Sequence, residues 1–433
     1  MLNHDFLERQ DEVESRARSY PRGLPIAIKK GEGSWLQDVE GRWYIDFLSG
    51  AGVLALGHCP PRVVKAVERQ LELLTHGLDL PTPVKQDFSD GVLSKLPPGM
   101  RDRFKIHFCG PTGADAVEAA VKLCKTATGR SNVVAFQGSY HGCTAGAMAL
   151  TSLIAPKLRV GNPMPGVHFM PFSYCGRCPL KLNPDTCDTN CIALLESTLT
   201  DTHGGFEPPA AVIIEMVQGE GGSIPARPEF VARLREVTRS VGVPLIVDEI
   251  QTGWGRTGDW FAFERYGIEP DVILLSKAIG AGFPVSVILY DKAFDVWEPG
   301  AHIGTFRGNQ LAFAAGLENL AVFEDEDILG NVRQRSAEAM EFLANLANEL
   351  DLIKEVRGVG LMIGVELRDT DEGREAARQV QKFSLKKGLI IERGGRDDLV
   401  LRLLPPLNIA GDVLLDGLGR FASALREAAA SCR

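Results

Sequence analysis

The sequence predicts an α/β fold in which a mostly parallel sheet is covered by helices. Five short segments rich in β-branched and aliphatic residues alternate with helical patterns along the middle of the 433-residue chain. Strands that are apolar throughout are typical of a parallel sheet buried on both faces, and their alternation with helices is typical of an α/β domain. The five segments are 132–136, 211–215, 244–248, 272–275 and 286–290.

Two segments between these strands have the spacing of amphipathic helices. In 113–127, apolar residues recur at i, i+1, i+4, i+5 and i+8, and Gly129 is placed to end the helix. Residues 229–242 form the second pattern. Together with the strands, these helices predict one large α/β domain over 55–310.

Both ends of the chain have a different pattern. Residues 24–48 contain two turn signals, GEG and DVEGRWY, that are typical of hairpins. The last third has a helical stretch at 310–350, short strands around LMIGVEL and LIIERGG, and a closing helix. We expect the two ends, 1–54 and 311–433, to form one smaller α+β domain. Residues 155–195 lack periodicity and are rich in Pro, Asn and Cys, which predicts a long surface excursion.

Composition and charge argue against several classes of function. Apolar residues make up 45% of the chain and charged residues 24%, as in ordinary globular proteins. The net charge of −9, without any basic block, argues against nucleic acid or an anionic membrane as a partner. No segment approaches the ~18 consecutive apolar residues of a membrane span, and the polar N-terminus lacks the pattern of a signal peptide. We therefore expect a cytoplasmic protein.

Lys277 and Asp248 are the first candidates for chemistry. Lys277 follows the apolar run DVILLS and precedes the glycine-rich AIGAGFP. Desolvation favours the neutral amine of a Schiff-base nucleophile, although a lysine that snorkels from a strand end has the same pattern. Asp248 ends another apolar strand, at the edge where open α/β sheets bind ligands. An anion there suits the protonated pyridine nitrogen of pyridoxal phosphate, or else a structural ion pair or helix cap.

A candidate phosphate site precedes the helix at 113–127. The segment FCGPTGADAVEAAVK places Gly110, Thr112 and Gly113 at the helix N-terminus, where backbone N–H groups and the positive end of the dipole favour a phosphate. The segment is not a Walker loop, because the Gly-Lys-Ser/Thr ending is missing. GVGLMIG at 358–364 does not have the spacing of a dinucleotide-binding motif either.

Seven segments in a fixed order extend this pattern over nearly the whole chain. They are GPTGADAVEAAVK, FQGSYHGCT, VQGEGG, VDEIQTGWGRTG, SKAIGAGFP, GTFRGNQ and RLLPPL. Together they resemble the class III, or ω-amino-group, aminotransferases of pyridoxal phosphate fold type I. ESRARSYPRGLPIAIKK, FCGPTGADAVEAA and WEPGAHIGTFRGNQLAFAAG are most similar to the diaminobutyrate–2-oxoglutarate aminotransferases within that class. The resemblance implies pyridoxal 5'-phosphate as cofactor.

The resemblance also implies roles for individual residues around the cofactor. Lys277 forms the Schiff base and then moves the proton between carbons, while Asp248 pairs with the pyridine nitrogen. Gln251 reaches the phenolic oxygen, and Tyr140 stacks on the ring or is an ordinary core tyrosine. Thr305, in GTFRGN, caps the phosphate of the neighbouring subunit, which implies a homodimer.

The phosphate itself is expected to contact Thr112 and the backbone of Gly113 and Ala114. The common class pattern here is Ser-Gly-Thr-Glu, whereas this chain has Thr-Gly-Ala-Asp. Ala114 therefore lacks a hydroxyl that is a possible phosphate ligand, but the backbone donors remain.

Two further residues match positions that address the substrate. Arg402 corresponds to the arginine that grips the α-carboxylate of the 2-oxo acid, for which its planar fork is suited. Glu220 corresponds to a glutamate that neutralises this arginine during the ω-amine step and swings aside for 2-oxoglutarate; a permanent salt bridge is the alternative. Residues 46–58 and 76–82 are expected to line the substrate pocket, where Asp79 meets the α-amino group of diaminobutyrate or is only a surface aspartate.

The implied reaction moves the C4 amino group between L-2,4-diaminobutyrate and 2-oxoglutarate, with aspartate 4-semialdehyde and glutamate as products, reversibly. Other ω-amines, such as 4-aminobutyrate or ornithine, are an alternative substrate class. A pyridoxal phosphate racemase or epimerase on the same fold and a non-catalytic binding protein are further alternatives. The presence of both Lys277 and Asp248 argues against a protein without catalysis.

Nine cysteines without a signal peptide indicate free thiols and no disulfide framework. Four of them, Cys175, Cys178, Cys187 and Cys191, have a spacing that suits a closed zinc site. Since the family requires no metal, structural thiols are the first interpretation and zinc is the alternative. His141 is expected to pack near the site and not to bind a metal.

Overall fold

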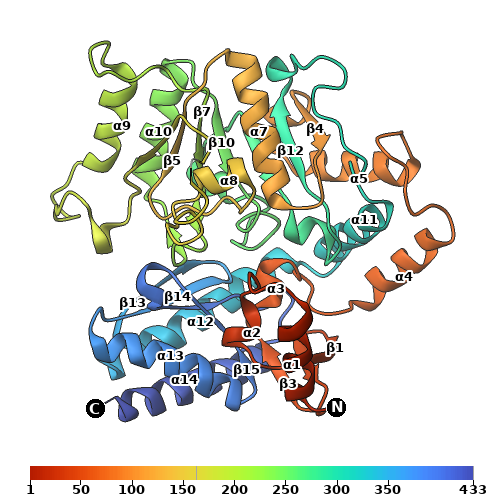
Figure 1. Ribbon diagram of the computed structural model, residues 1–433, viewed down its shortest axis with the longest axis vertical. Helices are drawn as coiled ribbons and strands as arrows, with labels where there is room; N and C mark the ends of the chain where they lie inside the picture. Colours follow the sequence, from red (N-terminus) through yellow and green to blue (C-terminus); the bar gives the residue numbers. More distant parts are fainter. Residues whose placement is uncertain (162, 433) are drawn as a thin grey trace.

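The computed structural model describes residues 1–161 and 163–432, and its large domain is built on a seven-stranded sheet (Figure 1). The strand order is β4-β12-β11-β10-β7-β5-β6. The last five strands of this order run parallel, whereas β12 is antiparallel to both of its neighbours. The bounds are β4 Phe104–Phe108, β5 Val133–Phe136, β6 Val167–Met170, β7 Ala211–Ile214, β10 Leu245–Asp248, β11 Val272–Leu275 and β12 Val287–Asp291.

All five segments predicted as strands form strands of this sheet, which confirms the α/β class, but one of them runs in the opposite direction. The segment 286–290 becomes β12, antiparallel to β11. Its connection from β11 contains only the short 3-10 helix η3 (Lys277–Gly280). A parallel return requires a longer crossover, usually a full helix, so this link permits only an antiparallel neighbour.

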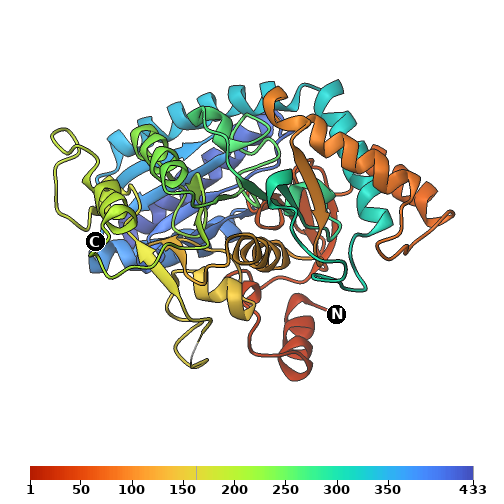
Figure 2. The same cartoon turned by 90° about the horizontal axis from the view of Figure 1, so that it is seen from above.

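Helices cover both faces of the sheet, as the apolar strands predict. Alternate residues of β5 belong to different apolar clusters: Val133 packs with helix α7 (Gly113–Thr128), and Val134 packs with helix α10 (Pro228–Ser240). These helices lie on opposite sides of the strands (Figures 1 and 2). Helix α7 ends at Gly129, whose φ of 67° supplies the left-handed turn that favours glycine there.

The smaller domain joins the two ends of the chain. The N-terminal strands form two hairpins, and β15 pairs in parallel with β3, so the first and last parts of the chain share a sheet. Figure 1 shows them side by side below the large domain, in red and blue. A second sheet has the order β13-β14-β17-β16. The bounds are β1 Ile28–Glu32, β2 Trp35–Asp38, β3 Trp43–Asp46, β13 Ile353–Val359, β14 Met362–Leu367, β15 Leu389–Ile390, β16 Glu392–Gly394 and β17 Val400–Leu403.

Three segments differ from the expectation. The excursion predicted at 155–195 contains β6, which closes one edge of the large sheet, and the start of helix α9 (Asn190–Thr200). The abundant Pro, Asn and Cys residues around β6 conceal this short apolar run. The helical stretch at 310–350 is two helices, α11 (Gln310–Asp325) and α12 (Ile328–Glu349), because Asp327 between them adopts a left-handed φ of 44°. Helix α1 (Asn3–Val13) was not predicted.

The remaining helices range from single turns to the 22 residues of α12. Within 1–161 and 163–432, no helix is long and apolar enough to cross a membrane. The bounds are α2 Tyr20–Gly23, α3 Ser49–Gly52, α4 Pro61–Leu71, α5 Pro83–Ser94, α6 Pro98–Arg101, α8 Ala145–Leu150, α11 Gln310–Asp325, α12 Ile328–Glu349, α13 Asp371–Lys386 and α14 Gly411–Ser431. A two-stranded ribbon, β8 (Val217–Gln218) and β9 (Ile224–Pro225), completes the core elements near the site.

Candidate active site

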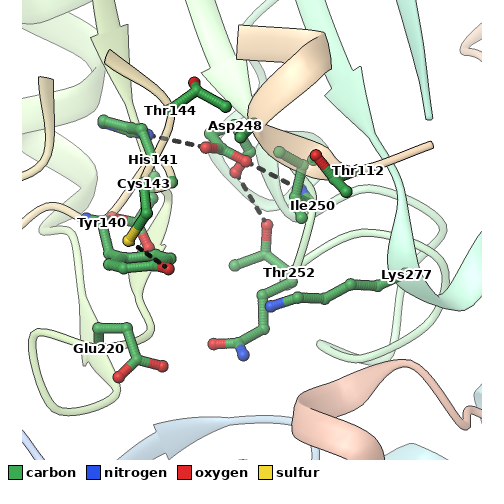
Figure 3. A pocket seen from close by; sticks show the side chains of 15 residues that line it. Thr112, Tyr140, His141, Cys143, Thr144, Glu220, Asp248, Ile250, Thr252 and Lys277 are labelled. Carbon is green, nitrogen blue, oxygen red and sulfur yellow. Dashed lines mark hydrogen bonds and ion pairs between the residues drawn. The ribbon is translucent and has the colours of Figure 1, made fainter. Parts of the chain in front are cut away.

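A cavity of about 420 Å³ opens at the carboxyl ends of the parallel strands (Figure 3). This is the edge where open α/β sheets bind ligands, and the volume lies within the roughly 300–1,000 Å³ of small-molecule sites. Eight of the predicted site residues line this cavity. They are Thr112, Gly113, Ala114, Tyr140, Glu220, Asp248, Gln251 and Lys277.

Lys277 extends its amine into the cavity from the end of β11 (Figure 3). Its φ of 48° is left-handed, an uncommon conformation for a residue with a side chain, and it turns the backbone sharply after the strand. Burial lowers the pKa of the amine, while the negative charge of Glu220 acts in the opposite direction. The lower pKa increases the fraction of neutral, nucleophilic amine.

Asp248 is held in place by a histidine behind it. It is the last residue of β10, and its side chain is only 4% exposed. One carboxylate oxygen lies 2.7 Å from Nδ1 of the fully buried His141, and the other accepts the backbone N–H of Ile250 at 3.0 Å. These partners fix the direction of the carboxyl group. His141 was expected only to pack here, but it is a specific partner of the central anion.

Glu215 is a buried carboxyl that the sequence analysis missed. It follows β7, lines the cavity, and accepts backbone N–H groups from Tyr140 at 2.9 Å and Gly219 at 3.0 Å. Burial raises its pKa to about 7; the positive charge of His141 opposes this increase and the negative charge of Asp248 adds to it. Like Asp248, it stands at the end of an apolar strand, so the same signal would have identified it.

The N-terminus of α7 forms another wall of the cavity. Thr112 is the N-cap, and its backbone N–H and hydroxyl both donate to Asp115, at 2.9 and 2.7 Å. The hydroxyl of Thr112 is therefore already engaged. The first N–H groups of an α-helix have no carbonyl of the same helix four residues earlier to bind. Gly142, with a φ of 126°, lets the next loop approach closely, because a Cβ there would lie 2.6 Å from that of Ala114.

Tyr140 and Gln251 line the cavity on different sides. The hydroxyl of Tyr140 lies 3.4 Å from the sulfur of Cys143, and burial raises the pKa of the phenol, so it stays neutral. The amide of Gln251 donates to the carbonyl of Ala51 at 3.2 Å, and its oxygen accepts from Arg402 at 3.2 Å. The predicted pocket segment 46–58 therefore reaches the site through Ala51.

Arg402 lies next to the cavity and is completely buried. Its Nη1 donates to Glu220 at 2.6 Å, as the resemblance implies, and to Glu392 at 3.0 Å. Burial tends to raise the pKa of Glu220, but the charge and hydrogen bond of Arg402 outweigh it and hold this pKa below its usual value. Glu392 was missed because its contact depends on the register between β16 and β17, where it is paired with Arg402.

Asp79 and Thr305 do not line the cavity of the chain that carries them. Both residues are exposed. The ring of His76, in the predicted pocket segment 76–82, lies 5.3 Å from that of Phe306. This segment is therefore beside the loop of Thr305, and within one chain the structure gives Asp79 no contact with the site.

The comparisons with known proteins decide the family. The sequence matches the family Aminotransferase class-III over residues 17–425. The chain belongs to this family.

Relatives of this class III aminotransferase cover almost its whole length. It is 47% identical to the diaminobutyrate–2-oxoglutarate aminotransferase of Rhizobium meliloti, over 98% of this chain and 92% of the relative. It is 44% identical to the enzyme of that name from Haemophilus influenzae, over 98% and 96%. The solved ornithine aminotransferase of Toxoplasma gondii, with pyridoxal phosphate at partial occupancy in its active site, is 29% identical, with a TM-score of 0.85 over 99% of this chain and 95% of the other.

Pyridoxal 5'-phosphate is the cofactor of this family, and the cavity of this aminotransferase provides what the cofactor requires. The carboxyl group of Asp248 is available for a protonated ring nitrogen, and the amine of Lys277, whose pKa is lowered by burial, for the aldehyde. The N-terminus of α7 at Gly113 and Ala114 suits a phosphate, and the ring of Tyr140 offers an aromatic face. The donor set therefore fits the cofactor.

The four clustered cysteines lie elsewhere, around a small separate cavity that Arg227 also lines. They are free thiols. Within the described ranges, no three His, Cys, Asp or Glu side chains come together as they would around a metal ion. The small cavity is lined by Cys175, Cys178, Cys187 and Cys191, among others.

Proposed function

We propose that this aminotransferase moves the C4 amino group between L-2,4-diaminobutyrate and 2-oxoglutarate, with aspartate 4-semialdehyde and glutamate as the other pair of compounds. The observation that carries the proposal is the buried ion pair of Arg402 and Glu220 beside the amine of Lys277. Such a pair allows one site to bind both an ω-amine, with Arg402 neutralised by Glu220, and a 2-oxo acid, with Arg402 on its α-carboxylate. The names of the two relatives above 40% identity support the choice of diaminobutyrate.

At the cofactor end, each residue has a separate task. The bound cofactor supplies an electron sink for the carbon that loses its proton. Asp248, oriented by His141, would hold the ring nitrogen, and the first turn of α7 at Gly113 and Ala114 would bind the phosphate. With the cofactor bound, the amine of Lys277 would act as general base and acid, taking the proton from the reacting carbon of the substrate and giving it back.

At the substrate end, Arg402 changes its partner between the two halves of the reaction. While the amine donor is bound, Glu220 neutralises the guanidinium, at 2.6 Å. When 2-oxoglutarate enters, its α-carboxylate takes that place through two parallel hydrogen bonds, and Glu220 rotates away. Glu220 lies in a turn after β8 and not within a strand, which favours such a rotation.

We propose a homodimer in which Thr305 reaches the phosphate of the neighbouring site. Two adjacent segments, linked by the contact of His76 with Phe306, expose apolar side chains that a second copy would cover. Asp79 lies in the same region and is proposed to approach the partner's substrate. The cytoplasm is the proposed location. The exposed apolar residues include Leu71, Leu73, Leu74, Leu78, Leu80, Ile303 and Phe306.

The test is an amine-donor panel with purified holoenzyme and 2-oxoglutarate, with glutamate formation as the readout. We expect kcat/KM for diaminobutyrate to exceed that for ornithine and 4-aminobutyrate by at least about tenfold, the effect of one hydrogen bond to a charged group. A higher value for either of the other amines would refute the choice of substrate. Turnover of an amino acid without any 2-oxo acid would favour a racemase instead.

A further inference from the structure

One guanidinium nitrogen, Nη1 of Arg402, is shared by two carboxylates from different parts of the chain. Glu220 comes from the turn after β8, and Glu392 comes from β16. Among the described residues, neither carboxylate forms an ion pair with any other cation. Lys277 is the next cation that influences both carboxylates, but it is committed to the cofactor. The substrate end of the site therefore has two carboxyl groups for one permanent positive group, and burial raises the pKa of Glu392 against the opposing charge of Arg402.

Both carboxylates keep one oxygen available for another donor. Arg402 contacts Oε1 of Glu220 and Oε2 of Glu392. The second oxygen of each makes no hydrogen bond with a described residue and is not sealed within the protein, since the side chains are 30% and 18% exposed. A partly buried anion without a donor is costly, so such an oxygen suits a cationic partner that arrives with a ligand.

The two carboxylates differ in how they are attached. Glu392 faces Arg402 across the antiparallel ladder of β16 and β17, so the sheet fixes its position. Glu220 lies in a turn and is the group proposed to move. The half-exposed side chain of Tyr20 also lies near the two carboxyl groups. Burial raises the pKa of its phenol to about 12, and the negative charges of Glu392 and Glu220 add to this increase.

We infer that Glu392 is a specificity residue that binds the second ammonium group of a diamino acid, a role that rests on the proposed function. With the C4 amine of diaminobutyrate directed to Lys277, the far end of the substrate carries an ammonium beside its carboxylate. The free oxygen of Glu392 accepts a hydrogen bond from that ammonium. The positive charge of the ammonium balances the second carboxyl group beside Arg402. A monoamine such as 4-aminobutyrate has no group for this contact, so Glu392 selects diamino acids.

The test compares two substrates that differ only in the α-ammonium group. In Glu392→Gln holoenzyme, we expect kcat/KM for diaminobutyrate to fall about 10–100-fold, mainly through KM, as for a lost hydrogen bond to a charged group. The kinetics of 4-aminobutyrate and of 2-oxoglutarate should change less than about threefold. Equal losses for both amines would show that Glu392 only positions Arg402 and would overturn the inference, as would an unchanged value for diaminobutyrate.

Two further variants serve as controls. Glu355→Gln removes a carboxylate from another arginine pair, with Arg357 at 2.7 Å in the same sheet, and should leave the ratio of the two amines unchanged. If Glu392→Gln does not fold, Glu392→Asp keeps the charge on a shorter side chain, and should lower the ratio less than tenfold but measurably. If the wild type rejects diaminobutyrate, the proposed function fails by itself. The same ratio is then measured with ornithine and 5-aminopentanoate, and an unchanged ratio in Glu392→Gln refutes the inference separately.

Discussion

The cofactor end and the substrate end of the cavity are built in different ways. Asp248, Lys277 and Glu215 all stand at the ends of neighbouring strands in one sheet, and backbone N–H groups or a buried histidine fix the carboxylates. The substrate end combines a turn of the large domain with two strands of the small domain at Arg402 and Glu392. The cofactor, which stays bound, has a rigid site. The two substrates, which bind in turn, have a site whose ion pairs can exchange.

The largest expected effect comes from the cofactor end. Lys277→Ala should reduce kcat in both half-reactions by on the order of 10⁴-fold, because it removes the group that moves the proton. Single-turnover measurements with diaminobutyrate and with 2-oxoglutarate check this. Lys65→Ala, on the exposed surface of α4, is the matched control and should retain full activity. Near-normal turnover in Lys277→Ala would mean that another group is the base in the proton transfer.

At the substrate end, a variant should separate the two half-reactions. Arg402→Lys keeps the charge but loses the planar fork, so KM for 2-oxoglutarate should rise roughly 100-fold while the amine half-reaction changes less than about threefold. Arg426→Lys, which alters an exposed pair with Glu349, should change neither. If both half-reactions decline together, Arg402 serves the structure of the site more than the recognition of the acid.

His141 tests whether the cofactor end depends on its rigid support. His141→Leu removes the 2.7 Å contact with Asp248, and kcat should fall about tenfold in both half-reactions, with faster loss of cofactor on dialysis. Stopped-flow kinetics and cofactor content measure these effects. An effect confined to one substrate would contradict the division of the cavity into two ends.

The smallest effect is on stability and concerns Glu215. Its pKa is about 7 in the folded protein and about 4.5 in the unfolded chain, so the folded state holds the proton more tightly between these values. This contribution is complete below pH 4.5 and is lost as the pH rises through 7; it is on the order of 3 kcal/mol. Denaturant unfolding of cofactor-free protein across this range should show a shallower decline in Glu215→Gln than in the wild type.

The cofactor end was predictable from the sequence because its residues are marked locally. A charged residue at the end of an apolar run, as at Asp248 and Lys277, indicates a strand end that faces a ligand. The partners of Arg402 are different: Glu220 was found only through the family resemblance, and Glu392 depends on the register of two strands. No local pattern encodes that register, whereas the short link between 275 and 286 was a local signal that β12 reverses its direction.

The pairing of β3 with β15 has a consequence for how the chain folds during synthesis. The partner strand for Trp43–Asp46 leaves the ribosome more than three hundred residues later, which at ~5–20 residues per second takes tens of seconds. During that time the N-terminal hairpins have an uncovered edge, and the large domain between them can fold first. A nascent chain that stops before Leu389 keeps that edge open, where chaperones or neighbouring chains can bind it.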